Sequence, residues 1–273
     1  MKPLVLLLPF FFWQTQTQPI RSNVHVLDVA SGKQQTIYSQ VLHLEAPNWS
    51  RDGRYLLVNS KGALYKLKTT GGELEKLNIG DAQGCNNDHG FSFDGKWLAI
   101  SHSINGKGSH ISVLPADGGQ PKTLTQKTPS YWHGWSPDGK TLAYCAQRDG
   151  NFDVYTIPVA GGDEKRLTKE DGLDDGPEYS PDGKFIYFNS YRTGKMQIWR
   201  MLADGSNPEQ ITKDELANWF AHVSPDGKWI AYISYLDDQA QNHPFGKRVK
   251  LRLMNLETRK VRDLTPEFFG GQG

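Results

Sequence analysis

One pentapeptide recurs five times along the 273-residue chain, and this repeat constrains the fold more than any other feature of the sequence. Its aspartates are separated by 42, 44, 44 and 44 residues. Spacing this constant indicates an array of similar structural units. The five copies are Ser50–Arg54, Ser92–Lys96, Ser136–Lys140, Ser180–Lys184 and Ser224–Lys228.

Each copy predicts a β-hairpin, and a second hairpin follows it. The glycine at the fourth place suits a type I turn followed by a left-handed residue, and a β-rich run such as Trp97–Ile100 comes next. The second hairpin is clearest in Asp153–Thr168, which turns at Gly161 and Gly162. Two hairpins give four antiparallel strands in about 44 residues. That unit is one blade of a β-propeller.

The two ends of the chain do not balance. Asn23–Ile37 has the second-hairpin pattern with no first hairpin before it, so six second hairpins accompany five first hairpins. We therefore predict an all-β, six-bladed propeller of four-stranded antiparallel blades whose sixth blade is incomplete. The rival hypothesis is a five-bladed ring that carries Asn23–Ile37 as an extra edge ribbon.

Composition excludes several classes of protein. With 31 basic and 30 acidic residues the net charge is +1, which disfavours a nucleic-acid partner. A mean hydropathy of −0.59 excludes a polytopic membrane protein. Two cysteines are too few for a disulfide scaffold or a Cys-rich zinc module. We expect Cys145, inside an apolar run, to be a buried small side chain.

The first 18 residues read as a secretory signal peptide. Lys2 gives a positive start, Pro3–Trp13 is an apolar run, and a polar stretch follows. The apolar run is too short to span a bilayer. The alternative is a buried N-terminal strand. We expect residues 1–18 to be removed, and residues 19–273 to form one propeller domain that is periplasmic or secreted, monomeric and without a transmembrane span.

The repeat resembles that of the TolB-like family, also called PD40 or WD40-like propellers, whose motif is W-S-P-D-G-K-x-[ILV]-A-[FY]. Trp135–Tyr144 matches it at every place, and the resemblance extends over about residues 23–268. It implies a six-bladed propeller with a central channel. It leaves the function open, because members of the family include scaffolds, substrate-gating domains of peptidases and sugar-cleaving enzymes.

Polar and aromatic residues gather just before the large residue that precedes each pentapeptide. A propeller brings corresponding positions of its blades to one mouth of the channel, so we expect these side chains to converge there. The candidate ligand-binding residues are Asp88, His89, Trp132, His133, Asp175, Glu178, Asn218, Trp219 and His222.

Three interpretations of this ring compete. In the first, the side chains cap strand ends and hydrate the channel. In the second, they form a cup for a protein or glycan ligand, in which Trp132 and Trp219 stack on the ligand while Asp175, Glu178 and Asn218 form hydrogen bonds.

The third interpretation is a metal-dependent lyase acting on uronate oligosaccharides, as the resemblance to oligogalacturonate lyases implies. There His89, His133 and His222 would hold a divalent ion that acidifies the proton beside a uronate carboxylate. Those lyases carry a closely spaced histidine cluster late in the chain, whereas these three histidines lie in separate blades. We therefore predict a non-catalytic binding or scaffold protein without a cofactor, with the lyase as the alternative.

Two further features lie outside the ring. Leu236–Arg248 is an insertion between the two hairpins of the fifth repeat, and its His243-Pro-Phe tip is the part that we expect to touch a partner. Arg148 and Arg192 follow the first hairpins of adjacent repeats. We expect both to order those connections by hydrogen bonds to neighbouring carbonyls.

Overall fold

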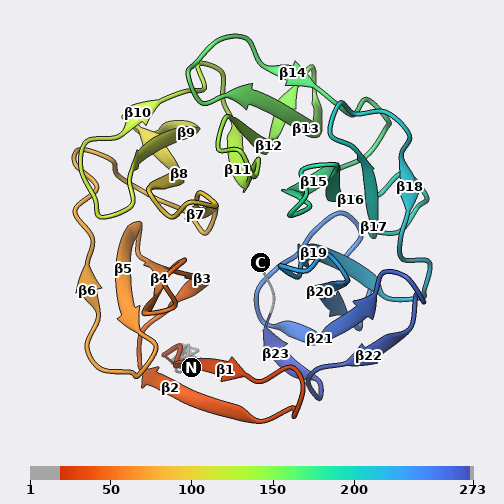
Figure 1. Ribbon diagram of the computed structural model, residues 1–273, viewed down its shortest axis with the longest axis horizontal. Helices are drawn as coiled ribbons and strands as arrows, with labels where there is room; N and C mark the ends of the chain where they lie inside the picture. The colour runs from red at the N-terminus through yellow and green to blue at the C-terminus, as the bar shows by residue number, and fades with distance from the viewer. Residues whose placement is uncertain (1–18, 271–273) are drawn as a thin grey trace, which may run out of the picture.

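A computed structural model describes residues 19–270, and all its regular elements are β-strands arranged as a ring (Figure 1). Five blades of four antiparallel strands surround a central channel, with the strands of each blade in sequence order from the channel outward. Between residues 19 and 270 there is no helix long and apolar enough to cross a membrane. The expectation about a signal peptide concerns residues 1–18, which lie outside the described residues.

The strands of the five blades follow the repeat. Blade one comprises β3 (Glu45–Trp49), β4 (Tyr55–Ser60), β5 (Ala63–Lys68) and β6 (Glu75–Lys76). Blade two comprises β7 (His89–Phe91), β8 (Trp97–Ile104), β9 (Lys107–Pro115) and β10 (Lys122–Thr123). Blade three comprises β11 (Ser130–Trp135), β12 (Thr141–Arg148), β13 (Asn151–Pro158) and β14 (Lys165–Arg166).

Blade four comprises β15 (Asp174–Tyr179), β16 (Phe185–Ser190), β17 (Gln197–Leu202) and β18 (Glu209–Gln210). Blade five comprises β19 (Ala217–Val223), β20 (Trp229–Tyr235), β21 (Lys247–Asn255) and β22 (Val261–Asp263), and β23 (Phe268–Gly270) also pairs with β21.

The predicted propeller is confirmed, but the prediction of six blades is wrong. β1 (Ser22–Leu27) and β2 (Gln34–Gln40) form a separate two-stranded sheet that lies between blades one and five (Figure 1). Only five inner hairpins carry the pentapeptide, and only those five build complete blades. The structure thus agrees with the rival hypothesis of five blades and an extra ribbon.

The pentapeptide organises its own turn in every blade. The serine hydroxyl donates to the aspartate carboxylate two residues later over 2.5–2.8 Å and accepts the amide that begins the next strand. The glycines have φ between 68° and 75°, a left-handed conformation that side-chain-bearing residues disfavour. Ser, Asp and Gly are therefore each required by the turn itself.

Neighbouring blades are joined by one position of the second strand. The fifth residue of that strand bonds to the backbone within or just before the next blade's inner strand. Asn59 donates to the carbonyls of Cys85 and Asn86, Ser101 accepts from Trp132, Cys145 donates to Asp174, and Asn189 accepts from Phe220. Cys145 is buried as expected, but it also makes this interblade contact.

Candidate functional site in the central channel

Bulges in the inner strands aim side chains into the channel. The pairing register shifts in β3, β11, β15 and β19 just before each strand reaches its turn. Three of these bulges contain a residue with positive φ: Ala46 at 48°, Gly176 at 61° and Phe220 at 51°. Because a bulge places two residues opposite one, it redirects the side chains on either side of it.

The channel holds two chambers that share part of their walls. The larger has a volume of about 680 Å³ and is lined by the inner strands of all five blades. The smaller, of about 390 Å³, lies beside residues that begin the inner strands and beside the insertion of blade five. Asn87, Asp88, His133 and Phe220 line both chambers.

In the larger chamber Glu178 and His222 form an ion pair. One carboxylate oxygen of Glu178 lies 2.6 Å from Nδ1 of His222, and the other accepts the amide of Val223 over 3.0 Å. The Glu178 carboxylate raises the pKa of His222 above its usual value. The His222 side chain is 69% exposed to the solvent within the ring. The chamber thus presents a carboxylate hydrogen-bonded to an imidazole to any ligand that enters.

The rim of the larger chamber is aromatic and cationic. Trp49 is 49% exposed. Arg51 donates to the carbonyls of Phe91 and Ser92 and stacks on the ring of Phe93, with 4.8 Å between its guanidinium carbon and the ring centroid. The rim therefore offers one exposed indole beside a fixed positive charge.

In the smaller chamber Asp175 bridges two histidines. One carboxylate oxygen lies 3.1 Å from Nε2 of His133, and the other lies 3.8 Å from Nε2 of His243. Burial lowers the pKa of His133, but the Asp175 carboxylate more than offsets this and holds that pKa above its usual value. Burial lowers the pKa of His243 below its usual value. The environment of the bridge therefore favours the charged form of His133 and the neutral form of His243.

Asp88 lies on the wall common to both chambers. Its carboxylate accepts a hydrogen bond from the Asn86 amide over 2.6 Å and forms no ion pair with a described residue. Burial raises the pKa of Asp88 to about 6, with His133 acting in the opposite direction. Asp88 is consequently a carboxylate held in the channel wall without a close cation.

Seven of the nine predicted residues line the chambers, although they do not meet at a single mouth. The larger chamber takes Asp88, His89, Trp132, His133, Glu178 and His222, whereas Asp175 lines the smaller one. Trp132 is only 7% exposed and packs over Gly90, where a Cβ would lie 2.3 Å from the indole. It presents little surface for a ligand to stack on.

The expected positions of Asn218 and Trp219 at the channel surface are wrong. Trp219 is fully buried and packs against Phe220 and His243. Asn218 is also fully buried, and its side chain bonds to Gln197, Asp214 and Ser234. Both side chains precede the bulge and pack between blades four and five.

Sequence reasoning missed Phe220 and found His243 only in part. Phe220 lies on the bulge with φ of 51°, a conformation that no glycine in the sequence indicates. His243 comes from the insertion Leu236–Arg248, whose extra length did indicate a functional segment. The insertion folds back so that His243 lines the smaller chamber, while Phe245 packs on His43 at 5.3 Å between ring centroids.

The three histidines of the lyase hypothesis are not arranged as ligands of one ion. Within residues 19–270 no three His, Cys, Asp or Glu side chains are grouped closely enough to hold a metal. His89 is 2% exposed, and burial lowers its pKa to about 4. His133 and His222 pair with different carboxylates. The donor set does not fit a divalent ion.

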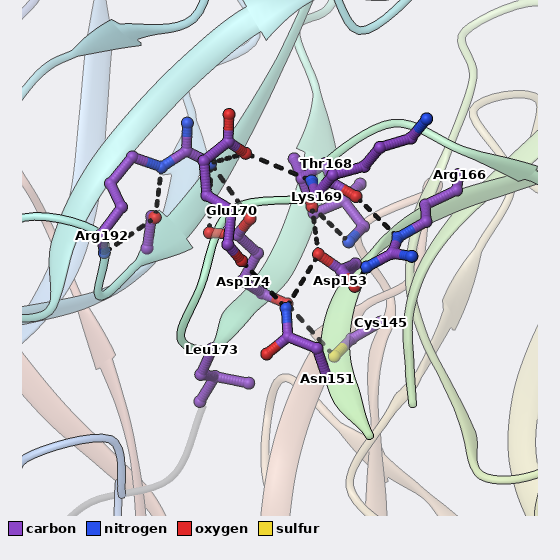
Figure 2. Close-up of polar contacts among 12 residues, drawn as sticks. Cys145, Asn151, Asp153, Arg166, Thr168, Lys169, Glu170, Leu173, Asp174 and Arg192 are labelled. Atoms are coloured by element: carbon purple, nitrogen blue, oxygen red, sulfur yellow. Dashed lines mark hydrogen bonds and ion pairs between the residues drawn. The ribbon is translucent and has the colours of Figure 1, made fainter. Parts of the chain in front are cut away.

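The two arginines singled out in the sequence lie outside the channel. Arg148 donates to the carbonyls of Pro129 and Gln147, as expected, and to both oxygens of Glu164. Arg192 pairs with Asp174 instead of a carbonyl. Figure 2 shows this pair close to a second one, Arg166 with Asp153, where blades three and four meet. Each of these ion pairs joins two residues of the same blade.

Comparison with known proteins gives a consistent family. The profile of the PD40 family, described as "TolB beta propeller domain", matches residues 127–271. A solved structure described as "putative TolB" from Agrobacterium tumefaciens is 46% identical, with a TM-score of 0.88 and coverage of 93% of this chain and 91% of that one. An uncharacterized protein of Agrobacterium fabrum is 46% identical over 114 residues, which span 41% of this chain and 39% of that relative.

More distant structures share the fold alone. TolB from Acinetobacter baumannii is 21% identical, with a TM-score of 0.72 and coverage of 92% of this chain and 59% of that one. An oligogalacturonate lyase in complex with manganese is 16% identical, with a TM-score of 0.59 and coverage of 91% and 73%. At this sequence identity, the similarity to the lyase shows a shared backbone fold and carries no information about activity.

Proposed function

The chain belongs to the TolB β-propeller family, and on that premise we propose that it is a non-catalytic binding protein that holds a segment of another protein in the larger chamber. The observation that carries the proposal is a 680 Å³ cavity to which every blade contributes. Its volume falls within the range of ligand sites. Its lining combines an exposed tryptophan, prolines and a charged pair, which suits a ligand of mixed polarity.

A protein segment fits the lining better than a glycan. Sugar rings are bound by stacking on open aromatic faces, and the two tryptophans expected to stack, Trp132 and Trp219, are buried. Only Trp49 is half exposed at the rim. Pro47, Pro181 and Pro225 add apolar surface without donors, on which side chains of a peptide can pack.

We also propose that the protein acts outside the cytoplasm. The support is the pattern of residues 1–18, a positive start, an apolar run and a polar exit, which is typical of an export signal. Fusing residues 1–18 to a reporter enzyme that is active only after export tests this proposal. Failure of the fusion to reach the periplasm would contradict the extracytoplasmic location and leave the binding proposal standing.

The binding proposal is tested by selecting peptides from a random display library on the folded protein. We expect Trp49→Ala to weaken binding of the selected peptides at least about tenfold, since truncating a tryptophan on which binding depends typically costs about 2 kcal/mol or more. Trp97→Ala is the matched control, because Trp97 is 46% exposed and lies outside the chamber. Equal effects of the two variants, or selection of no peptide, would overturn the proposal. Binding on a glycan array would assign a glycan instead.

A further inference from the structure

The smaller chamber has room for a long side chain of a ligand. Its volume is about 390 Å³, and Tyr131 and Phe152 line it with ring centroids 6.3 Å apart. Leu173 adds apolar surface. A flexible aliphatic stem gains by packing along such walls while its polar end reaches a polar group.

The charges of this chamber do not balance. Its acidic lining residues are Asp88 and Asp175, and its basic ones are His133 and His243; neither lysine nor arginine lines it within the described chain. Asp175 is matched by His133. Asp88 has an amide contact but no ion pair with a described residue. A carboxylate taken from water without a cation costs free energy, which an entering cation would recover.

The aromatic walls favour the same kind of ligand. The negative face of a tyrosine or phenylalanine ring attracts an ammonium or guanidinium group within about 6 Å. Burial and the nearby Asp88 carboxylate raise the pKa of Tyr131, so its hydroxyl stays protonated beside that carboxylate. The Asp88 carboxylate and the Tyr131 ring thus both favour a cation in this chamber.

Building on the proposed binding function, we propose that the smaller chamber is a subsite for a cationic side chain of the ligand, a lysine or an arginine, whose stem packs against the paired rings of Tyr131 and Phe152 and whose charge is held by Asp88. Lysine and arginine share the same chemistry, because each carries a positive charge at the end of an aliphatic stem. The carboxylate and the rings are the groups that recognise it.

The test uses capped glycine–lysine–glycine and glycine–arginine–glycine peptides, together with the lysine peptide acetylated on its side-chain nitrogen, in NMR titrations of the whole chain. We expect at least one charged peptide to bind, and the acetylated one to bind at least about tenfold more weakly, because acetylation removes the charge that strengthens the hydrogen bond to Asp88. The charged peptide that binds more tightly identifies the preferred cation. Equal binding of charged and acetylated peptides, or no binding, would overturn the subsite.

Two variants assign the discrimination to this chamber. Asp88→Asn keeps the shape and the acceptor for Asn86, and it should reduce the preference for charged peptides to less than about twofold. Asp117→Asn, in a carboxylate that is 94% exposed, is the control and should leave the preference intact. Should Asp88→Asn not fold, Phe152→Leu is expected to weaken the charged peptide about threefold or more. Retained preference in the folded Asp88→Asn variant, or unchanged affinity of the charged peptide for Phe152→Leu, contradicts the subsite.

The subsite and the larger chamber can fail separately. In one outcome, Trp49→Ala weakens binding of the display-selected peptides, but the short peptides show no preference for charge. That outcome would remove the cationic subsite and leave the binding function. Charge preference without an effect of Trp49→Ala would remove the larger chamber as the main binding surface.

Discussion

Glu164 is the side chain on which the connection between blades two and three depends. Its oxygens accept hydrogen bonds from Arg148, Tyr144 and Lys127, and Arg148 also donates to the carbonyl of Pro129 in the preceding connection. The hydrogen bonds from Arg148, followed by those from Tyr144 and Lys127, outweigh burial and lower the pKa of Glu164 from 4.5 to about 2. Because the folded pKa lies below the unfolded one, this carboxylate stabilises the fold above about pH 4.5, and the stabilisation is lost as the pH falls toward 2.

We predict that Glu164→Gln lowers the free energy of unfolding at neutral pH by about 2 kcal/mol, after allowance for solvent screening, and flattens its dependence on pH below 4.5. Urea unfolding at a series of pH values measures both effects. Glu215→Gln is the control, because the Glu215 side chain is 100% exposed and pairs with Lys195 only at the surface. An unchanged acid limb in Glu164→Gln would show that other carboxylates dominate acid unfolding.

At the scale of the strand, the bulge in β19 depends on Asn189 of the preceding blade. The Asn189 amide oxygen accepts the backbone amide of Phe220, whose φ is 51°. We predict that Asn189→Ala costs about 2–3 kcal/mol, because it leaves a buried amide unsatisfied and opens a cavity. Thermal unfolding measures the loss, and Asn242→Ala, in an exposed loop, should be nearly neutral. A cost below about 0.5 kcal/mol would mean that the bulge holds its conformation unaided.

The strands could be predicted from the sequence because the turns that bound them are stabilised by residues close in the sequence. The bulges could not. Ser, Asp and Gly of the pentapeptide satisfy the hydrogen bonds of a turn within a few residues, so the pattern is visible in one dimension. A bulge instead uses a partner in the neighbouring blade, as Phe220 uses Asn189. The register shift turns Trp219 into the core, whereas its correspondence to positions before the pentapeptide in the other blades predicted a place in the channel.

At the scale of the molecule, the ring closes through a two-stranded sheet. Val24 packs against Leu56, Val58 and Leu67 of blade one, and Arg262 of blade five donates to the carbonyl of Val29. Counting second hairpins predicted a sixth blade, because one hairpin pattern looks the same whether or not an inner hairpin accompanies it. The number of pentapeptides was the better guide to complete blades.

We predict that β1 and β2 open before the rest of the ring. Most of their residues are partly or fully exposed, so their amides should exchange with solvent faster than those of β12 and β13 in hydrogen–deuterium exchange. Val24→Ala should cost about 1–2 kcal/mol and increase this difference. Val29→Ala, at a position 45% exposed, is the control. Equal exchange rates in all sheets would show instead that the ring opens as one unit.

Because Asp88, His133 and Phe220 line both chambers, we expect an occupant of one chamber to change the affinity of the other for its own ligand. A group that fills one chamber changes the charge or the position of side chains that the other chamber also presents. Linkage requires such coupling to be reciprocal, so that the first occupant alters the affinity for the second by the same factor as the second alters that for the first. In a five-bladed ring with one divided channel, the affinity of each chamber would then depend on whether the other chamber is occupied.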